Sequence, residues 1–149
     1  MSLETAVVAQ MKEAMKSKNK VALETLRAIK SQILLAKTES GAKESLSEEE
    51  EIKLVQRLLK QRKESASIYK EQGREDLAAD ELEQAAVLEQ FLPKQLSDDE
   101  LEQELKEIMN SVGASGMQDM GKVMGVASKQ LAGKADGKRI SAKVREMLA

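Results

Sequence analysis

The chain has 149 residues, with 26 Asp and Glu against 24 Lys and Arg, so its formal net charge is −2. It contains no histidine, cysteine or tryptophan. These absences exclude disulfide frameworks, cysteine nucleophiles, Ser-His-Asp triads and metal sites with cysteine or histidine ligands. Tyr69 and Phe91 are the only aromatic residues, so a base-stacking platform is not expected. Any catalysis would depend on carboxylates, lysines, hydroxyls or a borrowed magnesium ion, and no cofactor is expected.

The remaining composition favours helices. Charged residues make up 34% of the chain and apolar residues 41%, while β-branched and aromatic residues are scarce. No apolar run is long enough to span a membrane, and the first residues lack the basic and apolar regions of a secretory signal. An all-α, cytoplasmic protein is therefore expected.

Four helices are predicted before Pro93, the only proline, because apolar residues recur there with the spacing of one helix face. Their inward positions are Leu3, Val7, Met11 and Met15; Leu26, Ile29, Ile33 and Ala36; Ile52, Val55, Leu59, Ala66 and Tyr69; and Ala78, Leu82, Ala85, Leu88 and Leu92. The breaks fall at residues 17–20, Gly41, Gly73 and Pro93. Ser47 and Glu50 form a predicted capping box.

Three shorter helices are predicted after the proline. Their inward positions are Leu101, Leu105, Ile108 and Val112; Met120, Val123, Met124, Ala127 and Leu131; and Ile140, Val144, Met147 and Leu148. The expected caps and breaks are the Ser97–Glu100 capping box, the stretch 113–116, Gly133 and the N-cap Asp136. Two domains follow: residues 1–93 with long antiparallel helices, and residues 94–149 with a small three-helix bundle.

Charge is distributed unevenly along the second domain. Residues 97–107 hold six acids and one lysine, a net charge of −5, while residues 116–149 hold seven bases and three acids, a net charge of +4. Lys122 and Lys129 share one helix face opposite the core, Lys138 and Arg145 repeat the same spacing, and Lys134 lies between the two helices. Such a set can contact successive phosphates. A soluble bundle decorated with lysines is the alternative.

Glycines in the same region allow two interpretations. Residues 116–122 match G-x-x-x-x-G-K, but Val123 replaces the Ser or Thr of a phosphate loop and no strand precedes it, so a nucleotide site is rejected. Gly121 and Gly125 are four residues apart, a spacing that usually marks a tight helix crossing. The alternative is that this bare face admits the backbone of a ligand, with Lys122 and Lys129 beside it.

Other side chains that could serve in a catalytic or binding site are better explained by the fold. Arg62 falls on an apolar helix face, which predicts an ion pair with Glu89. Acids at residues 48–51 and 98–99 fit first-turn positions better than an acid–base pair. Five methionines are better explained as side chains that fill the core than as the lining of a groove for a partner: Met109, Met117, Met120, Met124 and Met147.

Several motifs in order resemble the YqeY family over nearly the whole chain. They are residues 23–27 (LETLR), 60–65 (KQRKES), 73–77 (GREDL), 88–93 (LEQFLP), 113–115 (GAS), 119–125 (DMGKVMG) and 135–138 (ADGK). The family is similar to the tail region of GatB, which is one component of the tRNA-dependent amidotransferase. The resemblance implies a fold like that tail in residues 94–149 and a role in holding tRNA. It carries Gly121, Lys122, Lys134, Gly137 and Lys138 over as RNA-contacting positions, but no catalytic residue.

Three functions remain open at this point. The first is a non-catalytic, tRNA-associated helical protein linked to amidotransferase or aminoacyl-tRNA machinery, with RNA contacts at Gly121, Lys122, Lys129, Lys134, Gly137, Lys138 and Arg145. The second is a protein–protein adaptor with no RNA role. The third is a participating component of a carbon–nitrogen ligase that uses glutamine as amido donor, although the chain shows neither an activated nucleophile nor a nucleotide site. The sequence does not indicate an oligomeric state.

Overall fold

The computed structural model describes residues 2–39, 41 and 43–149, and within them the all-α prediction is confirmed. The helices are α1 (Leu3–Lys16), α2 (Lys20–Glu39), α3 (Glu48–Glu71), α4 (Glu75–Glu89), α5 (Asp98–Val112), the 3-10 helix η1 (Met117–Asp119), α6 (Met120–Gln130) and α7 (Gly137–Leu148). The chain forms two compact units, Met1–Leu92 and Pro93–Ala149. None of the described helices is long and apolar enough to cross a membrane.

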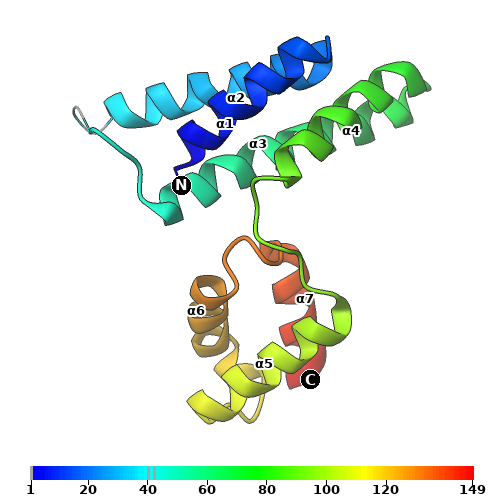
Figure 1. The fold of residues 1–149 in the computed structure, drawn as a ribbon. Helices are drawn as coiled ribbons and strands as arrows, with labels where there is room; N and C mark the ends of the chain where they lie inside the picture. The colour runs from blue at the N-terminus through cyan, green and yellow to red at the C-terminus, as the bar shows by residue number, and fades with distance from the viewer. Residues whose placement is uncertain (1, 40, 42) are drawn as a thin grey trace. The chain divides into compact units, whose positions relative to one another are not determined.

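The first unit consists of two antiparallel helical hairpins, α1–α2 and α3–α4 (Figure 1). The first turns of α1 and α3 both have side-chain caps, from Ser2 and Ser47. Ser47 and Glu50 form the predicted capping box of α3. The backbone N–H of Leu3 at the start of α1 donates to the carboxylate of Glu51, which ties the two hairpins together. Negative charge near the first amides of a helix is also favoured by the helix dipole.

The core of the first unit differs from the predicted set at both of its hairpins. Met15 is 53% exposed and Leu82 is 41% exposed, so both predictions were wrong. Met15 lies 12 residues after Leu3, and a strict step of four drifts about 120° around the helix over that distance. Leu82 lies about 120° from the fully buried Leu88, because two steps of three fall short of whole turns by about 60° each. The positions that are buried instead include Ala14, Thr25, Leu54, Leu58 and Val87.

Helix α4 ends at Glu89 and not at Pro93 as predicted. The N–H groups of Phe91 and Leu92 donate to the carbonyls of Leu88 and Glu89 at 3.1 Å each, which is the tighter i to i−3 pattern. Proline disfavours helical geometry in the residue before it, so the chain leaves the helix early. Leu92 still packs against the core of the first unit.

The second unit packs α5, α6 and α7 around its own core. Its buried residues are Leu101, Leu105, Ile108, Met109, Val123, Ala127, Leu131, Ala135, Ile140 and Val144. The Ser97–Glu100 capping box begins α5, and Gly113 ends it at φ +68°, in the left-handed region that favours glycine. Asp136 caps α7 by accepting a hydrogen bond from the N–H of Arg139 at 2.8 Å. These three local predictions are confirmed.

Candidate nucleic-acid interface

Besides Lys94 and Lys106, which lie before and on α5, five basic side chains of the second unit are exposed and free of ion pairs in the described part of the chain. They are Lys122 and Lys129 on α6, Lys134 in the α6–α7 loop, and Lys138 and Arg145 on α7. Within residues 2–39, 41 and 43–149, none of the five makes a salt bridge. Helices α6 and α7 contact each other. The residues predicted as RNA contacts therefore present unneutralised charge on two packed helices and the loop that joins them.

The loop that carries Lys134 is held in place by main-chain contacts. The N–H of Leu96 donates to the carbonyl of Lys134 at 2.8 Å, and the side-chain amide of Gln95 donates to the carbonyl of Gly133. Gly133 has φ +79°, a conformation that side-chain-bearing residues rarely adopt. Only the lysine side chain of Lys134 is thus left to solvent, and its backbone is fixed.

Two other bases of the same region have structural roles. Arg139 donates to the carbonyl of Leu96 at 2.9 Å and to the carboxylate of Asp98 at 3.0 Å. Lys143 lies 3.8 Å from Glu146 and its side chain is only 21% exposed. The sequence counts both among the seven bases of residues 116–149 but not among the candidate RNA contacts, and the structure shows both engaged with other residues. Arg139 lies three residues after the N-cap Asp136. This spacing places it in the first turn of a helix, but nothing in the nearby sequence indicates its contact with Leu96.

Lys122 and Lys138 occupy electrostatically unfavourable positions. Each lies in the first turn of its helix, α6 or α7, and neither helix has an acid in that turn. The first turns of α1, α3, α4 and α5 contain acids, although α2 begins with Lys20. Positive charge near a helix N-terminus opposes the helix dipole. The two lysines therefore do not stabilise the helices that carry them.

The predicted tight crossing at Gly121 and Gly125 is wrong. Both glycines are exposed, and a Cβ atom added to either would meet no other atom within 4 Å. Each lies two residues from Val123, the buried contact of α6, and is therefore turned about 160° away from it. The bare face of α6 is open to solvent next to Lys122 and Lys129. Gly137, at the start of α7, is also exposed with open space around it.

The segment that resembles a phosphate loop has a different fold. Gly116 leads into η1, and α6 begins at Met120. The carboxylate of Asp119 accepts a hydrogen bond from the N–H of Ser115 at 2.9 Å and makes no cap for α6. A strand followed by a glycine-rich loop, the context that a nucleotide site requires, does not occur in this segment.

The predicted Arg62–Glu89 pair is wrong. Arg62 Nε lies 2.8 Å from Gln84 Oε1 and 3.9 Å from Glu81 Oε2, whereas Glu89 lies 3.3 Å from Lys63 Nζ. The α3–α4 turn is centred near Gly73, so residues equally distant from it lie at one level. Gln84 meets that condition for Arg62, and Glu89 lies about 7.5 Å farther along the axis.

Four of the five methionines singled out in the sequence fill space around the second core. Met109 is buried, and Met120, Met124 and Met147 pack against the same cluster. Met117 is 44% exposed and does not belong to it. The core-filling interpretation therefore holds for four of the five positions.

Three carboxylates with a lowered pKa all lie in the first turns of helices. The pKa values of Glu50 and Glu100 are lowered by hydrogen bonds from Ser47 and Ser97, respectively. The largest effect in each comes from the backbone N–H of the serine. A hydrogen bond from Arg74 lowers the pKa of Asp76 at the start of α4. Among the described residues, no group of three or more carboxylates is placed to hold a metal ion.

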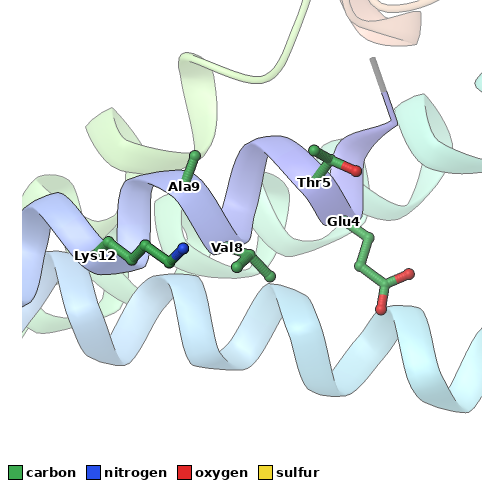
Figure 2. A pocket seen from close by; sticks show the side chains of 5 residues that line it. All are labelled: Glu4, Thr5, Val8, Ala9 and Lys12. Carbon is green, nitrogen blue, oxygen red and sulfur yellow. The ribbon is translucent and has the colours of Figure 1, made fainter.

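The first unit has a shallow hollow of about 360 Å³ along α1, lined by Glu4, Thr5, Val8, Ala9 and Lys12. Figure 2 shows that all five side chains come from this one helix, with Glu4 and Val8 directed toward α2 and Lys12 running along α1. Glu4 is already paired with Lys37 at 2.6 Å. The hydroxyl of Thr5 pairs with that of Ser2 at 2.8 Å, and among the described residues no hydrogen bond joins a possible nucleophile of the hollow to a general base.

These features define an all-helical protein whose second unit carries an exposed, unpaired basic surface. The family model for Yqey-like proteins matches residues 4–148, and the chain belongs to this family.

Two fungal relatives are both called altered inheritance of mitochondria protein 41, mitochondrial. The protein from Pyrenophora tritici-repentis is 31% identical over 144 residues, which cover 94% of this chain and 77% of the relative. The protein from Clavispora lusitaniae is 28% identical over 116 residues, which cover 76% of this chain and 66% of the relative.

Proposed function

We propose that this protein is a non-catalytic, tRNA-associated protein that contacts the phosphate backbone through its second unit. One observation carries the proposal: Lys122, Lys129, Lys134, Lys138 and Arg145 are exposed and unpaired, while Arg139 and Lys143 beside them are engaged. Each phosphate that such a base neutralises releases counterions and adds to affinity.

Recognition would depend on charge and shape. The two aromatic residues, Tyr69 and Phe91, both lie in the first unit, so the second unit has no ring on which a base can stack. Contacts to phosphate position a nucleic acid without reading its sequence. The open glycine face of α6 next to Lys122 would let a sugar–phosphate strand approach the helix closely.

The link to the amidotransferase rests on the motifs that resemble the GatB tail region. We propose that the protein acts on tRNA beside that machinery or beside an aminoacyl-tRNA enzyme, and does not transfer an amide itself. Release of ammonia from glutamine by the purified chain would contradict this assignment and favour a role within a ligase.

The test is binding of the full chain to unfractionated tRNA over a salt series. Measurable binding at low salt is expected, with an affinity that falls linearly on a log–log plot against salt concentration. No binding at low salt would overturn the proposal.

Charge reversal separates binding from folding. The double variant Lys122→Glu/Lys138→Glu should lose most tRNA affinity, and its salt slope should fall by about 2. Its melting temperature should stay the same or rise, because each new acid lies in a first helical turn, where it contributes about 0.3–1 kcal/mol.

The matched control is Lys94→Glu/Lys106→Glu, in the same unit and with the same change in net charge. Lys106 lies on the acidic helix α5 and Lys94 precedes it. This control should bind tRNA much more tightly than the first variant. Equal losses of affinity in both variants would show that binding depends on the net charge of the chain and not on these particular lysines.

An adaptor role is the second candidate, favoured by Leu34 and Leu35 on α2, which are 51% and 53% exposed. It predicts a protein complex that survives nuclease treatment and is indifferent to both charge reversals.

We also propose a cytoplasmic location for this chain. The names of the two fungal relatives, by contrast, include the word mitochondrial. Microscopy of a fluorescent fusion in the source cells tests the proposed location.

A further inference from the structure

The far half of the α3–α4 hairpin lies outside the main core of the first unit. Among the described residues, the members of this core on α3 end at Leu59 and those on α4 begin at Val87. Beyond these positions the two helices meet through Ala66, Ala78 and Ala85, which are 2%, 0% and 3% exposed. Figure 1 shows the α3–α4 turn extending past the α1–α2 turn. Alanines bury little apolar area, so this half of the hairpin would gain from a partner.

One side of this half carries two regular rows of exposed residues. The row on α4 is Ala79, Leu82 and Ala86, with steps of three and four residues as in a coiled-coil seam, and Leu82 is 41% exposed. The row on α3 is Lys60, Lys63, Ser67 and Lys70, also exposed. The ion pair of Lys63 with Glu89, three residues after Ala86, shows that the two rows lie side by side.

The lysine row on α3 and the acids beside the apolar row on α4 are complementary in charge. Helix α4 contains six acids and no base, and three of them, Glu75, Glu83 and Glu89, flank the apolar row at 100° per residue. The α3 row contains three lysines and no acid. A second copy of the chain offers acids to the lysine row and lysines to these acids at once. We propose that this face of the α3–α4 hairpin binds the same face of a second copy, forming a four-helix bundle with two-fold symmetry.

The hydrogen bond between Arg62 and Gln84 sets the register of this bundle. It places Lys63 level with Glu83, and Ser67 level with Ala79. A two-fold axis parallel to the helices lays α3 of one copy on α4 of the other in antiparallel direction and keeps those levels. Lys63 then meets Glu83 of the second copy, and the small residues Ser67 and Ala79 let the helices approach.

The exposed ion pairs within the hairpin do not oppose this arrangement. Lys60 lies 4.0 Å from Glu64, and the two side chains are 68% and 60% exposed. Lys63 lies 3.3 Å from Glu89, with exposures of 56% and 50%. Pairs this exposed contribute little to stability, so the lysines are available to a second copy. Their aliphatic stems would then cover Leu82.

Sedimentation equilibrium of the full, nuclease-treated chain tests the proposal. A monomer–dimer equilibrium is expected that strengthens as salt is lowered, because the lysine row of each copy attracts the acids of α4 in the other. Leu82→Glu should weaken dimerisation about tenfold or more. The matched control is Ile68→Glu, on the same hairpin: Ile68 is 53% exposed but lies about 120° around α3 from the middle of the lysine row. It should dimerise like the unchanged chain.

Charge exchange tests the two-fold register. Lys63→Glu and Glu83→Lys should each weaken the dimer, and the double variant should restore it, because the same pair occurs twice in a symmetric interface. Circular dichroism checks that each variant stays helical. A chain that remains monomeric at its highest soluble concentration would overturn the proposal. Equal losses in Leu82→Glu and Ile68→Glu, or a double variant without recovery, would overturn it as well.

Discussion

The guanidinium of Arg139 connects the first turn of α7 to the first turn of α5, where it lies 3.0 Å from the carboxylate of Asp98. It also donates to the carbonyl of Leu96 at 2.9 Å. The Asp98 side chain is 86% exposed, whereas that of Arg139 is 35% exposed. The carbonyl contact is the better protected of the two.

Replacing Arg139 should therefore destabilise the protein more than replacing Asp98. Arg139→Ala should lower the free energy of unfolding by about 1.5–3 kcal/mol, because a hydrogen bond to a charged donor is lost. Asp98→Ala should lower it by less than about 1 kcal/mol, as is usual for an exposed ion pair. Urea unfolding of both variants measures the difference. Equal losses would show that the ion pair, and not the carbonyl contact, is the important interaction.

The capping boxes predict an acid-sensitive contribution to stability. The pKa values of Glu50 and Glu100 are lowered from 4.5 in the folded chain, mainly by hydrogen bonds from Ser47 and Ser97. Because the folded pKa values are depressed, their contribution is fully present above the ordinary value of 4.5 and is lost as the pH falls through the folded values. Unfolding measured from pH 7 downward should show this loss, and it should be smaller in Glu50→Gln/Glu100→Gln. Unchanged pH dependence in that variant would contradict the assignment.

The polar contact between α3 and α4 predicts non-additive effects. Arg62 and Glu81 have side chains 20% and 21% exposed, and among the described residues Glu81 Oε2 is buried without a hydrogen-bond partner. Arg62→Met alone leaves that carboxylate and Gln84 without the guanidinium and should destabilise the protein by about 1–3 kcal/mol. Adding Glu81→Met should recover part of the loss, because replacing both members is better tolerated than removing one. Glu89→Gln serves as the control and should be nearly neutral. A double variant less stable than the sum of its parts would contradict this prediction.

The open face of α6 predicts opposite effects on stability and on binding. Gly121→Ala and Gly125→Ala have room for a Cβ and should each stabilise the helix by up to about 1 kcal/mol. If a sugar–phosphate strand approaches this face, Gly121→Ala should at the same time weaken tRNA binding. Gly113→Ala is the contrasting control, since φ +68° strains any side chain there and the protein should lose stability. Unchanged tRNA affinity in Gly121→Ala would remove Gly121 from the interface.

Local features of the fold could be predicted well. The capping boxes at Ser47 and Ser97 and the N-cap Asp136 depend on side chains within three residues of each other, so their geometry is specified by short-range sequence. Inward positions such as Val7, Leu26 and Ile140 were identified because helical spacing shows one face. The errors at Met15 and Leu82 arose where a simple spacing was extended until it drifted around the helix.

Contacts between helices could not be predicted in the same way. The partner of Arg62 depends on the register of two helices, which the α3–α4 turn sets and which the spacing within one helix does not reveal. The open surroundings of Gly121 and Gly125 depend on which side of α6 faces α5 and α7. Helical spacing singled out five of the seven bases of residues 116–149 but gave no partner for the other two, Arg139 and Lys143. The engagement of Arg139 with Leu96 became visible only in three dimensions.

The contacts of residues 95–98 also determine where the second unit can be cut. Gln95 and Leu96 donate hydrogen bonds to carbonyls of the α6–α7 loop. Leu96 and Asp98 accept hydrogen bonds from the guanidinium of Arg139. A protease that cleaved after Asp98 would remove the anchor of the loop that carries Lys134, although every helix of the unit would be nearly intact. The smallest fragment that keeps this basic surface in shape therefore begins at or before Gln95.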